Sequence, residues 1–429
     1  MVDGLARRRI IQAALVPVLT AGALGIAGAL PAAATTAVRG ELLPAPAAGP
    51  GEQISVTAVD VSPLGVIAGN AQVTTTAGDG SVSTAAFPQR WAGIPRVGWL
   101  RQQLTLPAGA TSGRITGLTD LGEAGGSVTL GTTRAARWSI DGRSATLLGD
   151  ANSSVTTVGA NGPWAVLTTD PANPLAGASE LVSRAGVRTP VGGTPDLDNG
   201  DYRSVSSLGR DGTAMVWVAG GIGQGRQFWP VLWKGDATLR LPISSSSISR
   251  PACTSQVQAN GSVVYNGFVW AASGTAFELV RHTDGIPGTD AVLARATTQQ
   301  QPRGGLECAP VTSVGALAPD GGVAGHLIDS NGKQAAYWDA GGTLTVVPLA
   351  AGELSATGVA VASGGRMAIL TRHDDGISRV SLWDDGVRTP LTTPAGWKVI
   401  SVVELTEAGL LVANASNAAG VVRPIAWKP

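Results

Sequence analysis

The sequence carries little charge: 14% of its residues are Asp, Glu, Lys or Arg, and 30 basic residues balance 30 acidic ones. A chain without net charge creates no field that attracts nucleic acid, so nucleic-acid binding is not expected. Histidines number three and cysteines two, and no Gly-x-Ser-x-Gly, His-Glu-x-x-His, P-loop or Cys/His zinc pattern occurs. These absences remove most of the support for metal hydrolase and nucleotide-binding functions.

Glycine and proline, in contrast, are abundant. The 59 glycines and 26 prolines, together with the low charge, are typical of short strands joined by many tight turns. The composition therefore predicts a β-rich globular fold.

Residues 1–37 have the layout of a signal peptide. Arg7–Arg9 precede an apolar run from Ile10 to Leu30, and the small residues Ala32 and Ala34 suit a signal peptidase. The arginines followed by two apolar residues resemble a twin-arginine export signal, and no cysteine lies nearby for lipid attachment. The segment predicts a bacterial protein secreted or held at the cell surface, with no stable membrane span after cleavage. The alternative is a retained anchor, because about 20 apolar residues can span a bilayer.

The rest of the chain, 38–429, contains an internal repeat with a period of roughly 40 to 50 residues. Its clearest copies are Val61–Gly69 and Leu317–Gly325, in which an aliphatic residue lies four positions before a turn glycine. Eight copies can be placed, with turn glycines at Gly65, Gly125, Gly162, Gly212, Gly261, Gly321, Gly365 and Gly409. The corresponding aliphatic residues are Val61, Leu121, Val158, Leu208, Val257, Leu317, Val361 and Leu405.

A tryptophan follows the turn in six repeats. Leu181 and Leu279 are the expected replacements in the third and fifth repeats. The six expected structural tryptophans are Trp91, Trp138, Trp233, Trp338, Trp383 and Trp427.

Each repeat has room for four short strands, the content of one propeller blade. We therefore predict an all-β fold in one domain: a β-propeller of eight blades with four antiparallel strands each, expected to be a monomer. The count becomes seven if the third repeat is an insertion. The chain ends at Trp427–Pro429, before the outer strand of the last repeat, and Gly40–Pro44 can supply that strand. The N-terminal strand is thus expected to complete the last blade and close the ring, which removes exposed sheet edges.

Three segments around the repeat tryptophans, Thr84–Gly93, Arg134–Gly142 and Gln334–Gly341, resemble bacterial HAF-type extracellular repeats. The resemblance covers nearly the whole of residues 38–429, although the His of the His-Ala-Phe signature is absent from every copy. It implies a secreted propeller and supplies no catalytic residues.

Two further features bear on stability and metal binding. Cys253 and Cys308 are an even pair in an exported chain and can form one disulfide, the alternative being two buried thiols. Asp196, Asp198 and Asp201 cluster oxygen ligands of the kind that calcium prefers. Their spacing is not that of an EF-hand, and a solvated acidic loop is the favoured alternative. No other cofactor is expected.

Acidic residues occupy the position five before the turn glycine in three repeats: Asp60, Asp120 and Glu404. These repeats are neighbours once the ring closes, so the three carboxyl groups are expected to converge near the axis. Such a group could hold a cation or contain one carboxyl of raised pKa for acid–base chemistry. The alternative is three acids that solvate strand ends.

The remaining polar and aromatic candidates favour structural roles. His282 and His373 both precede Asp-Gly turns and are expected to line them. Six tryptophans lie outside the repeat position, and we expect them to pack in the core or between blades: Trp99, Trp164, Trp217, Trp229, Trp270 and Trp397. We therefore predict a non-catalytic propeller that binds an extracellular cell-wall glycan or protein, the alternative being a secreted polysaccharide hydrolase or lyase.

Overall fold

Regular structure in the chain is almost entirely β-strand. The structure, a computed structural model, describes residues 37–94, 98–192, 202–220, 227–241, 256–257, 261, 263–271, 274–283, 285–297, 317–329 and 332–428. The single helical element with bounds in this part is a short 3-10 turn, η3 (Ser363–Gly365). Within these ranges no helix has the length and apolar character needed to cross a membrane.

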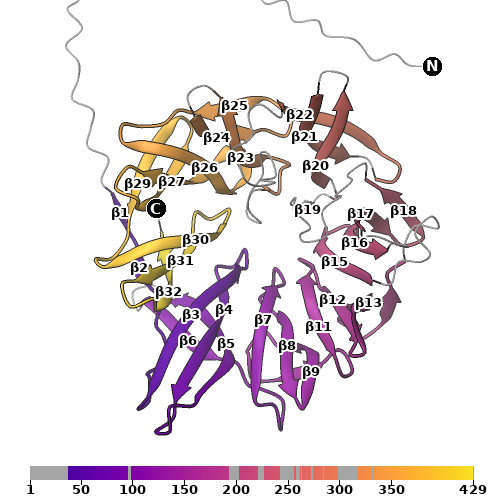
Figure 1. The fold of residues 1–429 in the computed structure, drawn as a ribbon, viewed down its shortest axis with the longest axis vertical. Helices are drawn as coiled ribbons and strands as arrows, with labels where there is room; N and C mark the ends of the chain where they lie inside the picture. The colour runs from indigo at the N-terminus through magenta and orange to yellow at the C-terminus, as the bar shows by residue number, and fades with distance from the viewer. Residues whose placement is uncertain are drawn as a thin grey trace, which may run out of the picture. The chain divides into compact units, whose positions relative to one another are not determined.

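The described strands form six sheets, four of four strands and two of eight (Figure 1). In each eight-stranded sheet one parallel contact, β13–β15 or β24–β26, joins two antiparallel sets. Counted by these sets, the strands fall into eight consecutive units. Unit 1 contains β3 (Glu52–Val61), β4 (Ile67–Thr76), β5 (Val82–Ile94) and β6 (Gly98–Gln103). Unit 2 contains β7 (Ser112–Leu118), β8 (Ala124–Leu130), β9 (Thr132–Trp138) and β10 (Ala145–Leu147). Unit 3 contains β11 (Ser153–Val158), β12 (Pro163–Asp170), β13 (Asn173–Ser183) and β14 (Arg188–Pro190). Unit 4 contains β15 (Tyr202–Leu208), β16 (Ala214–Gly220), β17 (Gln227–Lys234) and β18 (Ala237–Arg240).

The second half of the chain repeats this order. Unit 5 contains β19 (Gln256–Val257), β20 (Val263–Ala271), β21 (Gly274–Thr283) and β22 (Thr289–Thr297). Unit 6 contains β23 (Val323–Asp329), β24 (Gly332–Trp338) and β25 (Leu344–Val347). Unit 7 contains β26 (Glu353–Val361), β27 (Met367–His373), β28 (Ser378–Asp384) and β29 (Val387–Thr392). Unit 8 contains β30 (Trp397–Leu405), β31 (Leu411–Asn417) and β32 (Val422–Trp427).

The turn before the second or equivalent strand has the same form in the seven units whose turn is described. In unit 1 the N–H of Gly65 donates to the Ser62 carbonyl, and Gly65 has a φ of +75°. Glycine tolerates this left-handed conformation without the clash of a Cβ, which explains the regular turn glycines in the sequence. The predicted anchors hold in seven units. In six of them the aliphatic residue ends the first strand and pairs near the start of the second. In unit 6 Leu317 pairs with Val323, the first residue of β23, in an isolated bridge.

The anchor of the second repeat was wrong. Gly122, with a φ of +85°, closes the turn of unit 2, and Leu118 is the aliphatic residue at the strand end. Gly125 lies inside β8, where a Cβ would come within 2.4 Å of the Trp164 ring. A glycine required for close packing was therefore mistaken for a turn glycine.

The six repeat tryptophans occupy one register position, since each pairs with the first residue of the strand that follows its unit's glycine turn. The indole N–H of Trp91 donates to the Pro44 carbonyl at 2.7 Å, and that of Trp138 donates to the Thr105 carbonyl at 2.9 Å. Both carbonyls lie in the connection that precedes the unit. In units 1 and 2 the indole therefore ties this connection to the sheet while its ring, fully buried, fills the core.

The predicted replacements for this tryptophan were also wrong. Val182 holds the position in unit 3 and His282 holds it in unit 5. In unit 3 the indole comes from the adjacent strand, because Trp164 pairs with Val182 and is fully buried. The spacing along the chain could not show that the ring had moved to a neighbouring strand.

Clusters of buried hydrophobic side chains fill the spaces between consecutive units. One cluster, for example, joins Ala68 of unit 1 to Trp138 of unit 2. A further cluster contains Trp91 of unit 1 together with Val412 of unit 8, so the last unit packs against the first. Each large aliphatic side chain buried in this way contributes about 1.5 to 3 kcal/mol.

The N-terminal segment belongs to the last two units. β1 (Val38–Arg39) pairs in parallel with β29, and β2 (Glu41–Leu42) pairs with β32 as the outer strand of unit 8 (Figure 1). Leu43, 1% exposed, then enters the cluster between units 8 and 1. The structure thus has a propeller-like all-β fold in which both ends of the described chain share one sheet.

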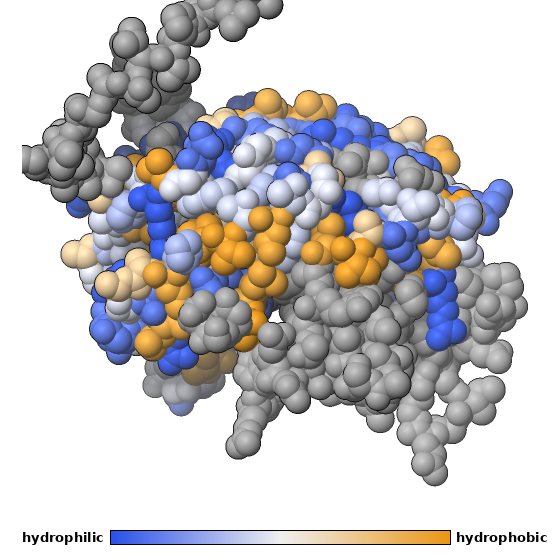
Figure 2. All heavy atoms as spheres, turned by 90° about the horizontal axis from the view of Figure 1, so that it is seen from above, coloured by the Kyte–Doolittle hydropathy of each residue, from blue (hydrophilic) through white to orange (hydrophobic). Residues whose placement is uncertain are grey.

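Hydrophilic and hydrophobic side chains are mixed over the surface. Figure 2 shows small hydrophobic patches between hydrophilic areas on the side that it views. Exposed large hydrophobic residues in units 6 and 7 include Leu344, Leu354 and Val387. Single exposed residues of this kind are normal on a protein surface.

Deleting residues 38–48 should lower the free energy of unfolding by several kcal/mol, because the deletion removes β1, β2, the buried Leu43 and the acceptor of the Trp91 indole. Urea unfolding of the deletion variant measures this loss. The control is Glu41→Ala, which trims an exposed side chain from β2. Equal midpoints for the deletion and the control would show that the N-terminal segment does not hold units 8 and 1 together.

Candidate functional site

Two acidic residues meet where unit 8 packs against unit 1. Asp60 and Glu404 are the second-last residues of β3 and β30, and the register of each strand shifts just before the acid. Such a β-bulge turns the following side chain toward a new direction. As a result each acid reaches the next unit: Glu404 reaches unit 1, and Asp60 reaches unit 2.

Backbone donors hold both carboxyl groups. The Val61 N–H donates to Oε2 of Glu404 at 3.3 Å and to Oδ1 of Asp60 at 2.8 Å. The Leu118 N–H donates to Oδ2 of Asp60 at 2.6 Å. Gly117 leaves room for this carboxyl group, since a Cβ there would lie 3.2 Å from Oδ2.

The two carboxyl groups both have a raised pKa, so the pair keeps a proton to a higher pH than separate acids would. Burial raises the pKa of Asp60 to about 6, against the lowering effect of the Leu118 and Val61 N–H groups and of the hydrogen bond from Glu404. Burial also raises the pKa of Glu404 well above its usual value, and the negative charge of Asp60 and the hydrogen bond to it raise it further. The proton therefore resides on Glu404, which donates to the Asp60 carboxylate.

Asp120 does not share this position. The equivalent residue of unit 2 is Gly117, and Asp120 lies in the following turn, where its side chain forms an ion pair with Arg210 at 2.6 Å. Its charge still raises the pKa of Asp60 and of Glu404, but it is the weakest contributor named for either. The predicted cluster of three acids is therefore a pair with a more distant, neutralised third member. The error follows from the misplaced turn glycine of the second repeat.

A serine in unit 4 shows what this position requires for structure alone. The Val257 N–H donates to Oγ of Ser207 at 3.0 Å, in the same way that the Leu118 N–H donates to Asp60. A neutral hydroxyl therefore suffices to join one unit to the next. The acidic pair adds something that the joint between units does not need.

A second polar contact between units involves the fourth residue of the strand that follows each glycine turn. Asn414 donates to the Ala58 carbonyl at 3.0 Å and accepts from the Ala58 N–H at 2.8 Å. Asn70 makes the same two bonds to Ile115. His326 holds this position in unit 6 and is 1% exposed. Burial and, to a smaller degree, the charge of Lys333 lower the pKa of His326 to about 3.

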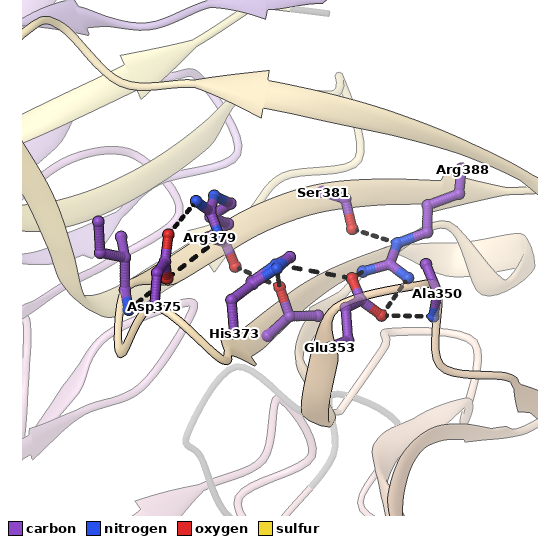
Figure 3. Close-up of polar contacts among 9 residues, drawn as sticks. Ala350, Glu353, His373, Asp375, Arg379, Ser381 and Arg388 are labelled. Carbon is purple, nitrogen blue, oxygen red and sulfur yellow. Dashed lines mark hydrogen bonds and ion pairs between the residues drawn. The ribbon is translucent and has the colours of Figure 1, made fainter.

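The remaining histidines belong to structural clusters. His282 contacts Asp290 at 2.8 Å and the Gly285 carbonyl at 2.7 Å, so it lines its turn as expected. Figure 3 shows His373 beside the ion pair of Glu353 and Arg388, whose guanidinium group bonds both carboxylate oxygens. Burial acts to raise the pKa of Glu353, but the hydrogen bonds from Arg388 and the Ala350 N–H hold it below its usual value. A matched pair of this kind stabilises unit 7 and leaves no reactive group.

Tryptophans outside the repeat position pack as predicted where they are described. Trp164 is fully buried, and the Arg137 guanidinium group lies 5.1 Å from its ring centroid. The Lys428 ammonium group lies 4.4 Å from the Trp99 ring centroid, which adds a contact between the C-terminal end and unit 1. Trp217 and Trp397 are half-buried, and the side chains of Trp229 and Trp270 lie outside the described part.

The predicted disulfide and calcium site both fall on residues outside the described ranges. These residues are Cys253, Cys308, Asp196, Asp198 and Asp201, so the two sites stay predictions. Within the described ranges, no group of three or more His, Cys, Asp or Glu side chains could hold a metal ion.

No protein-family model and no curated protein matches the sequence, so the resemblance to HAF-type repeats stays a prediction. Among solved structures, the chain is similar to dipeptidyl peptidase 4 of Porphyromonas gingivalis, with 10% identity, a TM-score of 0.48, and coverage of 82% of this chain and 57% of that one. The acylaminoacyl peptidase of Pyrococcus horikoshii has 11% identity and a TM-score of 0.44, with coverage of 85% of this chain and 58% of that one. A puromycin hydrolase has 15% identity and a TM-score of 0.41, with coverage of 68% of this chain and 50% of that one.

The chain therefore spans between half and three-fifths of the length of these proteins. At such identities the likeness concerns the fold alone.

The prediction of a non-catalytic module that binds a cell-wall glycan or protein was wrong. The solved structures named above are two peptidases and a hydrolase, and none of those three names describes a binding module. The sequence showed Asp60 and Glu404 as separate acids near its two ends. It could not show that the two share a proton.

Glu404→Gln should stabilise the protein at pH 8 by about 1 to 3 kcal/mol, and by less at pH 5. Both carboxyl groups have a higher pKa in the folded protein than in the unfolded chain, where it is about 4. The stability that the pair contributes is therefore greatest below about pH 4 and is lost as the pH rises through about 6. The amide introduced by Glu404→Gln cannot ionise and still donates to Asp60. The variant should therefore lose less stability at high pH than the wild-type protein. Urea unfolding at the two pH values tests this, and a gain independent of pH would contradict the shared proton.

His326→Asn should make stability less sensitive to acid. The lowered pKa of His326 means that stability is present above about 6.5 and falls as pH decreases toward 3. Between pH 7 and pH 5 the wild-type protein should lose about 2 kcal/mol through this residue, and the variant should not. Denaturant midpoints at both pH values provide the measurement. The same loss in both proteins would rule out a buried, neutral His326.

Proposed function

We propose that the protein is an exported hydrolase of amide bonds, with Asp60 and Glu404 as its catalytic acids on an eight-bladed β-propeller. The observation that carries the proposal is the meeting of two carboxyl groups on the one N–H of Val61, at the contact of units 8 and 1. The raised pKa of both groups supports it. Enzymes of several kinds use such a pair, one member as base and the other as acid.

The units support the fold in this proposal. Each of the eight antiparallel units packs on the next, and the cluster containing Leu43, Trp91 and Val412 joins the last to the first. We infer a closed ring of eight blades, with β2 as the outer strand of the last. Unit 3 has four strands of its own, which argues against its being an insertion into a seven-bladed ring.

The chemistry follows from the protonation states. Above pH about 6 Asp60 is ionised while Glu404 keeps its proton. Asp60 takes a proton from a water molecule as its oxygen attacks the carbonyl carbon, and Glu404 donates a hydrogen bond to the carbonyl oxygen. The C–N bond then breaks as the proton held by Asp60 moves to the leaving nitrogen. The pair returns to its initial state, and one water has been added across the bond.

The closeness of the two groups favours amide over glycosidic bonds. Glycosidases separate their carboxyl groups by about 5 to 9.5 Å, so that a sugar and often a water fit between them. The carboxyl groups of Asp60 and Glu404 accept from the same N–H, that of Val61, so they lie side by side. Such a pair corresponds to the proton-sharing dyad of acid proteases.

The pair also costs stability at neutral pH, where Glu404 or Asp60 must ionise beside the other. Ser207 joins units 4 and 5 at the same position without that cost. Strained or repulsive groups of this type are a feature of functional sites. The cost therefore supports a catalytic role.

The neighbouring turns suggest the substrate. Leu64 and Leu121 hold equivalent turn positions in units 1 and 2 and are 69% and 47% exposed. Other units place Asn161, Asp211 or Asp320 there, residues that favour turns. Two exposed leucines beside the acids would hold an apolar residue next to the cleaved bond. Export by residues 1–37 would place this activity outside the cytoplasmic membrane.

Quenched fluorescent peptides with apolar residues should be cleaved by the full-length protein purified after export. The rate should rise as pH increases through about 6, because Asp60 must be ionised to act as base. Asp60→Asn and Glu404→Gln should each lower kcat at least a hundredfold. Ser207→Ala is the matched control, because it removes a joint at the same register position and should leave the rate unchanged.

Unchanged rates in both acid variants would overturn the proposal. Release of reducing ends from polysaccharide, with no peptide cleavage, would overturn its substrate class.

A further inference from the structure

A polar groove lies along unit 1, near the other end of β3 from Asp60. It has a volume of about 380 Å³, and alternate residues of β3 and β4 line it, including Gln53, Thr57 and Gln72. Arg114 of β7 lines it from unit 2. Alternate residues of a strand point to one face, so the sheet itself sets this row of amides and hydroxyls.

These side chains have unused hydrogen-bonding capacity. Gln53, Thr57, Gln72 and Arg114 make no side-chain hydrogen bond or ion pair with any residue in the described ranges. Asn70, by contrast, is fully engaged with Ile115 and forms the end of the groove nearest to Asp60. Four free polar groups converging on one cavity are the arrangement expected of a ligand site.

The charge of the groove selects an anion. Arg114 is its one ionic residue, and among the described residues that line it there is no acid. A guanidinium group binds a carboxylate through two parallel hydrogen bonds, and side-chain amides pair with peptide N–H and C=O groups. The described lining also contains no aromatic ring on which a sugar could stack.

We propose that this groove binds the C-terminal carboxylate of a short peptide, with Arg114 on the carboxylate and Gln53 and Gln72 on the preceding amides. The site goes beyond the hydrolase proposal and does not depend on it, because binding here needs no chemistry at Asp60 or Glu404. A volume of about 380 Å³ suits two or three small residues.

A second groove provides the comparison. It lies between units 3 and 4, has a volume of about 470 Å³, and is lined by Arg203 together with Asp170. An acid in the lining repels a carboxylate, so this groove should not bind the same ligand.

The test is calorimetric titration of the Asp60→Asn, Glu404→Gln double variant with acetyl-trialanine carrying either a free carboxylate or a C-terminal amide. The double variant prevents cleavage, so a failed hydrolase proposal cannot affect the outcome. The free carboxylate should bind at least tenfold more tightly than the amide. Arg114→Gln should abolish this preference, whereas Arg203→Gln should leave it intact.

Gln72→Glu provides a second variant that should fold normally, because Gln72 is exposed and Glu has the same shape as Gln. It should weaken binding of the free carboxylate at least tenfold more than binding of the amide, because only the carboxylate is repelled by the introduced charge. The proposal would be overturned by equal affinity for the two peptides or by a preference for the carboxylate that survives Arg114→Gln. It would also be overturned if neither peptide bound at about 10 mM, a concentration that would reveal even weak binding.

Discussion

The packing of each unit on its two neighbours is the interaction on which the rest of the structure depends. A single twisted sheet of four strands cannot bury both of its faces, so every unit relies on the next for its core. The first and last units would each keep one face exposed unless they met. The cluster of Leu43, Trp91 and Val412 provides that contact, and β2 adds an N-terminal strand to the C-terminal unit.

The same contact creates the candidate site. Asp60 and Glu404 come from opposite ends of the chain and lie together only because unit 8 packs on unit 1. Elsewhere the equivalent position carries residues such as Ser207, which join the units without ionising. Folding and the proposed chemistry are thus coupled: the contact that completes the core also brings two carboxyl groups close enough to share a proton, at some cost in stability near neutral pH.

Local patterns in the sequence predicted the repeated features well. Turn glycines such as Gly65, and repeat tryptophans such as Trp91, are dictated by backbone conformation and core volume within one unit, so they recur at readable spacings. Features that depend on contacts with a neighbouring unit could not be predicted from the sequence. Gly125 is required by the Trp164 ring of the next unit, and mistaking it for a turn glycine displaced Asp120 into a site to which it does not belong. The shared proton also needs two bulges and one contact between units, none of which leaves a sequence signal.

The protonation of the pair is the most direct test of this account. Carbon-13 NMR of the side-chain carboxyl groups, followed from pH 3 to pH 9 (about the range over which such groups titrate), reports each group separately. The account predicts an apparent pKa of about 6 for Asp60 and a higher one for Glu404, with Glu404→Gln changing the Asp60 titration. Independent titration of both groups near pH 4, unaffected by the substitution, would contradict the shared proton and the proposed chemistry with it.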